Sequence, residues 1–184
     1  MQVVPYSPEH VGELRHVCIS NAGERARTSK AHAAFTLAMY CDPYLEHGVA
    51  YMLVDDEGVA RGYIFACEDW DRWAVDTSSY REMIKELGPE YQALYADEAT
   101  FYDSVKADYP AHLHIDIEEP YTGDGNGRLL METLLARLRS DGVTGVVLGV
   151  AASNERAVGF YRHMGFTLLS EYGNGDGYIF CMKL

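Results

Sequence analysis

Three glycines at alternate positions, Gly123, Gly125 and Gly127, lie where a strand-like run passes into a helix-like run. Glycine adopts positive φ without a steric penalty and has no Cβ to hold an anion away from the backbone. The following helix adds unpaired N–H groups and the positive end of its dipole. The segment 121–128 is therefore suited to a phosphate or pyrophosphate, although the same glycines could simply form a tight turn.

Two common nucleotide sites do not fit this loop. A P-loop requires a lysine after its last glycine, and no lysine follows any of these glycines. The dinucleotide motif Gly-x-Gly-x-x-Gly requires a third glycine where Arg128 stands, and it normally follows the first strand of its fold. The loop therefore belongs to neither of these two classes of nucleotide site.

Polar side chains precede the loop on a strand expected at 112–117. His112, His114 and Asp116 alternate along this strand and therefore share one face of the sheet. Imidazole titrates near neutral pH, so either histidine could take a proton from an ammonium group, directly or through water. The alternative, a buried polar ladder that serves only structure, stays open.

A second group follows the loop on a helix expected at 154–163. Asn154, Ala157 and Tyr161 are spaced by three and four residues, which places them on one helix face. A tyrosine hydroxyl can act as a general acid. Tyr161 could instead be a core residue, as many of the 14 tyrosines will be, and Asn154 could be a helix N-cap.

The elements around these residues are predicted from hydrophobic periodicity and turn signals. Helices are expected at 7–18, 30–40, 81–87, 90–95, 129–139 and 154–163. Strands are expected at 3–6, 49–54, 60–66, 112–117, 146–150, 166–171 and 177–184, the second and third forming a hairpin. Alternation of strands and helices after the hairpin indicates an α/β domain with a mixed sheet.

Residues 69–110 differ in character from the rest of the chain. They contain both tryptophans, five tyrosines and many acidic residues. Long connections are commonly functional, and aromatic and acidic side chains together could line a pocket for a cationic amine. The same residues could also form a satellite core under two small helices.

Composition limits the function classes. A chain of 184 residues with 48% hydrophobic residues is expected to form a single domain spanning 1–184. The formal net charge of −13 argues against a nucleic-acid partner. The absence of a long apolar run or a signal-peptide pattern predicts no membrane partner, and four scattered cysteines are typical of reduced thiols in the cytoplasm. For the oligomeric state, a homodimer is the prior expectation.

The two motifs together resemble the GNAT family of N-acetyltransferases. The family's phosphate signature is Gln/Arg-x-x-Gly-x-Gly/Ala, which 122–127 match at both glycines, with Thr122 at the first position. The frame Asn154-x-x-Ala157-x-x-x-Tyr161, followed by Gly-Phe, resembles the later motif of this family. In detail the chain looks most like bacterial acetyltransferases related to the C-terminal acetyltransferase-like domain of O-GlcNAcase.

The resemblance implies a GNAT fold, with a mixed, mostly antiparallel sheet flanked by helices and a helical insertion at 69–110 before the fourth strand. It implies an acetyl-CoA-dependent N-acetyltransferase that transfers the acetyl group directly to a small-molecule or peptide amine, without a metal. The alternatives are a non-catalytic acyl-CoA-binding module and a partner-binding domain that has lost the cofactor. Thr122 and Asp124 motivate the first alternative, since neither is expected beside a pyrophosphate.

The resemblance also assigns roles to residues. Tyr161 would be the general acid for the thiolate, and His112, His114 or Asp116 would supply the base, with His112 nearest to the glutamate base of some members. Ligands of the cofactor would be the strand backbone at Ile115, Asp116 and Ile117, the loop residues Gly123, Gly125, Asn126, Gly127 and Arg128, and the motif residues Asn154 and Tyr161.

Overall fold

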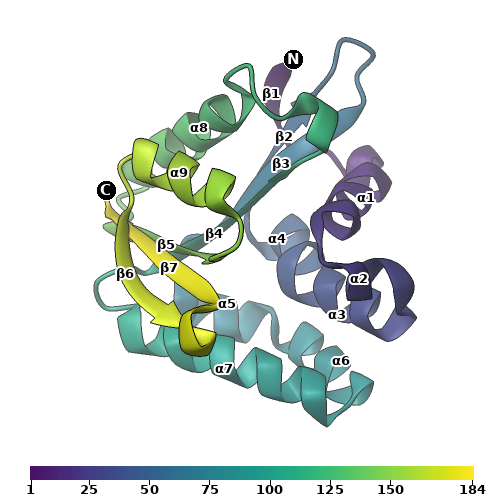
Figure 1. Ribbon diagram of the computed structural model, residues 1–184, viewed down its shortest axis with the longest axis vertical. Coiled ribbons are helices and arrows are strands. Elements are labelled where there is room, and N and C mark those ends of the chain that lie inside the picture. The colour runs from purple at the N-terminus through teal and green to yellow at the C-terminus, as the bar shows by residue number, and fades with distance from the viewer.

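The computed structural model describes all residues 1–184, which form one α/β domain around a seven-stranded sheet (Figure 1). The strands are β1 (Gln2–Pro5), β2 (Val49–Val54), β3 (Ala60–Cys67), β4 (Ala111–Ile117), β5 (Gly145–Ala151), β6 (Thr167–Tyr172) and β7 (Gly177–Lys183). Their order in the sheet is β1-β2-β3-β4-β5-β7-β6, and only the β4–β5 pair is parallel. The predicted mixed, mostly antiparallel sheet is confirmed.

Helices cover both faces of this sheet. They are α1 (Val11–Asn21), α2 (Glu24–Thr28), α3 (Lys30–Tyr40), α4 (Asp42–His47), α5 (Trp70–Asp76), α6 (Ser78–Leu87), α7 (Pro89–Val105), α8 (Asn126–Ser140) and α9 (Glu155–His163). Three short 3₁₀ turns are η1 (Pro8–His10), η2 (Glu119–Tyr121) and η3 (Gly173–Gly175). None of the helices is both long and apolar enough to cross a membrane.

The structure adds helices that periodicity did not predict. The short helices α2, α4 and α5 are too brief to show a repeated apolar pattern. Helix α7 continues to Val105, well past the expected end at residue 95. Its inward positions Tyr95, Glu98 and Tyr102 do have helical spacing, but they mix aromatic and acidic residues, so hydrophobicity alone did not reveal them.

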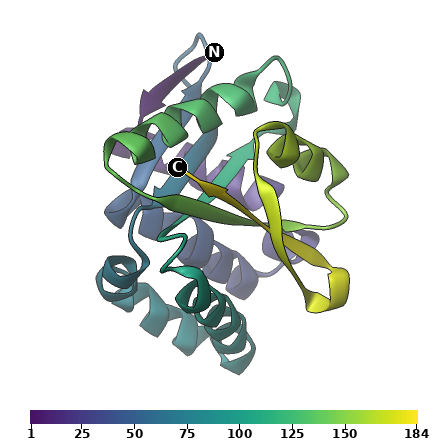
Figure 2. The same ribbon diagram turned by 90° about the vertical axis from the view of Figure 1, so that its left-hand side faces the viewer.

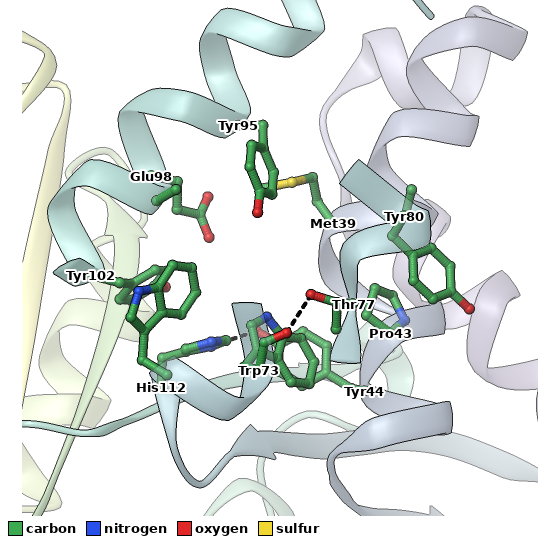
Figure 3. A pocket seen from close by; sticks show the side chains of 13 residues that line it. Met39, Pro43, Tyr44, Trp73, Thr77, Tyr80, Tyr95, Glu98, Tyr102 and His112 are labelled. Atoms are coloured by element: carbon green, nitrogen blue, oxygen red, sulfur yellow. Dashed lines mark hydrogen bonds between the residues drawn. The ribbon is translucent and has the colours of Figure 1, made fainter. Parts of the chain in front are cut away.

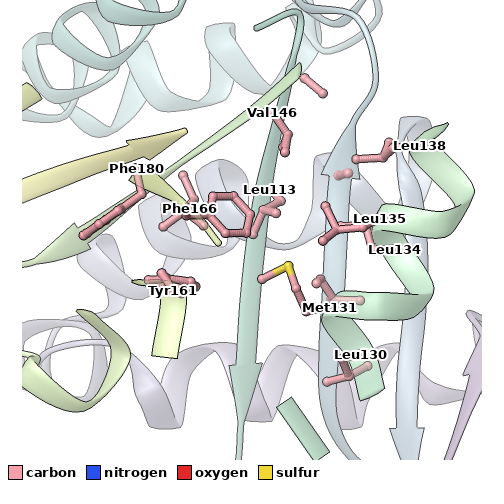
Figure 4. Packing of buried hydrophobic residues seen from close by; sticks show 14 of the residues in the cluster. Leu113, Leu130, Met131, Leu134, Leu135, Leu138, Val146, Tyr161, Phe166 and Phe180 are labelled. Carbon is pink, nitrogen blue, oxygen red and sulfur yellow. The ribbon is translucent and has the colours of Figure 1, made fainter. Parts of the chain in front are cut away.

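The first face of the sheet is covered by α8 and α9. The apolar side of α8 packs on β1, β2 and β3, and Val158 and Tyr161 of α9 join the same core (Figures 2 and 4). The fully buried side chains of α8 are Leu130, Met131, Leu134 and Leu138. Each such side chain stabilises the fold by roughly 1.5–3 kcal/mol relative to exposure. This core fixes the start of α8, and hence the glycine loop that precedes it.

The second face is covered by the N-terminal helices and by residues 69–110. Helices α1 and α4 pack on β3, and Trp70 and Trp73 of α5 extend their core. Phe101 and Tyr102 of α7 pack over Val147 of β5 and its neighbours on β7. The segment 69–110 is therefore part of the main body, as Figure 1 shows along its lower edge. The four cysteines are all buried and form no disulfide.

Candidate active site

Strands β4 and β5 separate almost as soon as they meet. They pair only at Ala111–Val146 and His112–Val147, although β4 continues to Ile117. On its other edge β4 stays paired with β3 up to Ile117. The remainder of β4 therefore presents one unpaired edge to a gap in the middle of the sheet.

The hydrogen-bond pattern shows which backbone groups face that gap. The N–H of Glu118 donates to the carbonyl of Arg61 at 2.8 Å, so the alternation of an antiparallel ladder turns the backbone of Asp116 toward β3 as well. Ile115 and Ile117 then direct their N–H and C=O groups into the gap. A ligand with amide groups could pair with them as a strand would.

The glycine loop lies at the far end of β4, directly before α8. Gly123, Asp124 and Gly125 all have positive φ, at 99°, 46° and 81°. A Cβ on Gly123 or Gly125 would point into open space, so the loop leaves its surface clear. Asp124 is exposed, and short polar residues tolerate this conformation. The loop is thus a glycine turn at a helix N-terminus, as the sequence predicted, but the N–H of Asn126 already donates to the carbonyl of Gly123 at 3.0 Å.

Side chains brace the loop from both sides. The buried amide of Asn126 donates to the carbonyl of Tyr121 at 3.0 Å. Arg156, in the first turn of α9, donates to the hydroxyl of Thr122 at 3.0 Å. A guanidinium therefore stands beside the position where the phosphate signature has Gln or Arg. Arg128 is exposed and pairs with Glu132 at 2.7 Å.

Helix α9 places the second motif at the gap. The side-chain oxygen of Asn154 accepts from the N–H of Ala157 at 3.1 Å, so Asn154 is an N-cap. Its amide N–H₂ group stays free, because no protein group accepts from it. The ring of Tyr161 packs against Phe160, Phe166 and Phe180. Its hydroxyl has no hydrogen-bond partner in the protein, and burial raises its pKa, so it remains a protonated donor.

His112 is enclosed by aromatic rings. Its side chain lies against Tyr44, Trp70, Trp73 and Tyr102, and only 2% of its surface is exposed. Nδ1 bonds to the hydroxyl of Tyr44 at 2.7 Å, while Nε2 has no partner. Burial, with the nearby His114, lowers its pKa to about 3. The ring is therefore neutral and shielded, which favours the structural interpretation of His112 over the catalytic one.

The buried His112 should make folding sensitive to acid. Its pKa is about 3 in the folded protein but about 6.5 when exposed, so the unfolded chain binds the extra proton between these values. As the pH is lowered through this window, the free energy of unfolding should decrease. The decrease between pH 7.5 and pH 4.5 should be about 2 to 3 kcal/mol from this residue alone. Urea denaturation across this pH range measures the slope.

His112→Gln removes the titrating group, and His16→Gln is a control at an exposed histidine of α1. We expect the glutamine at 112 to lower stability at pH 7.5 but to flatten the slope by about 2 kcal/mol over this range. The exposed replacement should leave the slope as it is. Equal slopes in wild type and His112→Gln would contradict a neutral, buried His112.

His114 and Asp116 form a second, more accessible cluster on the same face. The hydroxyl of Tyr63 donates to Asp116 at 2.7 Å and lies 3.1 Å from Nδ1 of His114. Nε2 of His114 is 3.8 Å from the Asp116 carboxylate. The side chains remain 29% and 23% exposed. Burial lowers the pKa of His114 and raises that of Asp116.

The gap brings the two polar groups together from opposite faces of the sheet. Tyr161 belongs to the core under α8 and α9, whereas His114 stacks on Tyr40 of α3 on the other face, with ring centroids 5.2 Å apart. Asp116 lies close enough to raise the pKa of Tyr161 by its charge. A ligand in the gap would thus have a proton donor on one side and a proton acceptor on the other.

Three residues of this face were not expected to belong to the site. Tyr40 and Tyr63 orient His114, and Glu98 of α7 accepts from the hydroxyl of Tyr40 at 2.8 Å. Burial raises the pKa of Glu98, opposed by hydrogen bonds from Tyr40 and Tyr102. Tyr40 and Glu98 are 58 residues apart in sequence. The only signal for Glu98 was its place in the aromatic and acidic segment 69–110.

Comparison with known proteins gives one family match. A sequence model described as the acetyltransferase (GNAT) family matches residues 23–166. This range contains the glycine loop, the gap-facing part of β4 and Tyr161.

Solved structures agree in fold. A crystal structure named SsHAT is similar over 99% of this chain and 97% of its own, with 28% identity and a TM-score of 0.85. An agmatine N-acetyltransferase variant in its apo form is 14% identical, covers 100% and 99%, and has a TM-score of 0.69. A phosphinothricin acetyltransferase from Sinorhizobium meliloti in complex with AcCoA is 12% identical, covers 100% and 88%, and has a TM-score of 0.58. The last two show likeness of fold alone.

Proposed function

Because the chain belongs to the GNAT family of acetyltransferases, we propose that it transfers the acetyl group of acetyl-CoA directly to a primary amine in a ternary complex. The observation that carries the proposal is the gap between β4 and β5, which ends at the glycine loop and is flanked by Tyr161 on one face and His114 on the other. The gap would hold the thioester, the loop would hold the phosphates of coenzyme A, and the two flanking side chains would carry the proton transfers.

The cofactor would lie along the gap. Backbone groups of Ile115 and Ile117 would pair with the amides of its pantetheine arm, with Asp116 between them on the far face. The pyrophosphate would rest on the loop, bound by Gly123, Gly125, Gly127 and Arg128, while Asn126, which bonds to Gly123 and Tyr121, would hold the loop in shape. Arg156 would supply the charge that Thr122 lacks, which answers the main departure from the phosphate signature. The free amide N–H₂ of Asn154 would donate to the pantetheine arm.

The chemistry then needs several proton transfers. His114, assisted by Asp116 and Tyr63, would take the proton of the acceptor ammonium, which leaves a neutral amine. The amine nitrogen attacks the thioester carbonyl, a C–N bond forms, and the C–S bond breaks. The nitrogen also loses its second proton, which would restore the hydroxyl of Tyr161 after that residue has protonated the thiolate. Tyr161 would give its proton to the departing thiolate. Backbone N–H groups at the gap would stabilise the oxyanion of the tetrahedral intermediate.

Direct transfer is favoured over an acyl-enzyme because no cysteine can reach the thioester. The four thiols are exposed by 4% or less, and none lies in the motif frame. Burial raises the pKa of the Cys67 thiol, which makes it a poor nucleophile. We propose that residues 1–184 form one catalytic unit, and that it works in the cytoplasm. Residues 69–110 would form a wall of the acceptor site.

Acetyl-CoA calorimetry tests the cofactor part of the proposal. Arg156→Ala should weaken binding about tenfold, because a charge-assisted contact to phosphate is lost from an exposed position. Arg139→Ala, at the other end of α8, is the matched control and should leave the affinity unchanged. Equal affinities of wild type and Arg156→Ala would contradict the role of Arg156, and no binding at millimolar acetyl-CoA would contradict the cofactor itself.

The second candidate is a non-catalytic acyl-CoA-binding module, which Thr122 and Asp124 in the loop favour. Release of free thiol from acetyl-CoA across a panel of amines, amino acids, aminoglycosides and peptides separates the two. Binding without thiol release for any acceptor would support the module and contradict the enzyme.

A further inference from the structure

A small cavity lies between α3, α4, α5, α7 and the beginning of β4, on the same face of the sheet as the candidate base (Figure 3). Its volume of about 30 Å³ is enough to hold a water molecule. A primary ammonium group has a similar size. The walls that matter here are Tyr44, Trp73, Tyr95, Glu98, Tyr102 and His112.

The polar groups of this cavity lack a cation. Glu98 forms no ion pair with any Lys or Arg, although Tyr40 and Tyr102 hydrogen-bond to its carboxylate. Nε2 of His112 is buried without a partner, because Nδ1 already bonds to Tyr44. Figure 3 shows Glu98 and His112 on the borders of one space. The carboxylate of Glu98 has lone pairs left to accept from an N–H donor, and Nε2 of His112 can accept as well once the ring adopts the Nδ1–H tautomer.

Aromatic faces complete a cation site. Trp73 packs on Tyr44 with ring centroids 4.6 Å apart, and Tyr102 stacks on His112 at 4.4 Å. Such rings attract an ammonium through their quadrupoles, and the attraction grows when the cation is desolvated. A neutral hydroxyl can donate a hydrogen bond to the carboxylate but gains no charge attraction from it or from the rings.

The cavity cannot hold the amine that reacts. A carboxylate stabilises the protonated form of a bound amine, and a protonated amine has no lone pair to attack a thioester. Tyr40 links the two places, because its hydroxyl donates to Glu98 at 2.8 Å while its ring stacks on His114 at 5.2 Å. Glu98 and the candidate base therefore contact the same tyrosine side chain, at its hydroxyl and at its ring.

We infer that this cavity anchors a second, non-reacting ammonium of the acceptor, so that the acceptors are alkyl diamines or longer polyamines. The inference rests on the proposed function, since it names the substrate class of the same site. One ammonium would pair with Glu98 between the aromatic rings, and the other would lose its proton to His114 and attack the thioester.

The test compares 1,4-diaminobutane with 4-amino-1-butanol, which replaces the anchoring ammonium by a hydroxyl. In wild type we expect kcat/KM for the diamine to exceed that for the amino alcohol at least tenfold, mainly through KM. In Glu98→Gln the diamine should lose this advantage, so that the ratio of the two kcat/KM values falls to near one whatever happens to the absolute rates. Asp97→Asn, which removes one charge from the exposed side of α7, is the matched control and should keep the preference.

The outcomes separate this inference from the proposed function. Calorimetry with the two amines in the absence of acetyl-CoA measures the anchor alone, so it remains informative if no acetyl transfer occurs. Equal binding of the two amines by wild type, or an unchanged preference in folded Glu98→Gln, would overturn the inference. The comparison in wild type needs no variant, so it decides the matter even if Glu98→Gln fails to fold.

Discussion

Tyr161→Phe is expected to lower kcat by between about 10² and 10⁴, the usual contribution of a positioned general acid. The departing thiolate would have to leave without a proton. KM for acetyl-CoA should change little, because the ring stays in its contacts with Phe160, Phe166 and Phe180. Stability should also be retained, since the hydroxyl has no protein partner to lose. Steady-state thiol release with saturating acceptor measures the effect.

A matched substitution gives the control for Tyr161. Tyr91→Phe removes a hydroxyl from another buried tyrosine, which lies on α7 in the cluster with Phe35. It should leave kcat unchanged. An acetyl thioester with a more acidic thiol should restore part of the rate of Tyr161→Phe, because a better leaving group needs less protonation. Undiminished turnover in Tyr161→Phe would show that another group protonates the thiolate.

His114→Gln is expected to reduce kcat/KM for the acceptor by a similar factor, between about 10² and 10⁴ at neutral pH. The pH profile identifies the cause. Burial lowers the pKa of His114, so the imidazole should remain an unprotonated base below the usual pH 6.5. Wild-type kcat/KM should therefore hold its plateau to a pH lower than 6.5 and fall only as the imidazole is protonated.

In His114→Gln this acid limb should disappear together with the activity. His163→Gln, at the exposed end of α9, is the control and should retain both. A variant that is slow but keeps the wild-type acid limb would show that the limb belongs to another group. His112 is a poor candidate for that group, because its ring is enclosed and titrates near 3.

The principal elements were predictable because their residues are periodic. The strands at 49–54 and 60–66, the glycine loop and the helix after it all appear where the sequence indicates. The Asn154–Tyr161 frame was readable because a helix fixes which residues share a face. The cofactor and catalytic roles of these residues remain predictions.

Two features of the site could not be read from the sequence. His112 and His114 are equivalent in pattern, and they differ only because Trp70, Trp73 and Tyr102 close over the first one. The pairing of Tyr40 with Glu98 depends on how α3 and α7 meet across 58 residues of chain. Tertiary contacts of this kind leave no local signal.

The closer kinship to O-GlcNAcase-related enzymes also remains a prediction.

The brief pairing of β4 with β5 has a thermodynamic consequence. Only two residue pairs join these strands. The sheet therefore consists of two halves, β1–β4 and β5–β7, with few backbone hydrogen bonds between them. A molecule that pairs with Ile115 and Ile117 would supply the missing backbone contacts and act as an additional strand. The concentration of such a molecule would then set part of the protein's resistance to unfolding, because binding to the native state alone shifts the folding equilibrium.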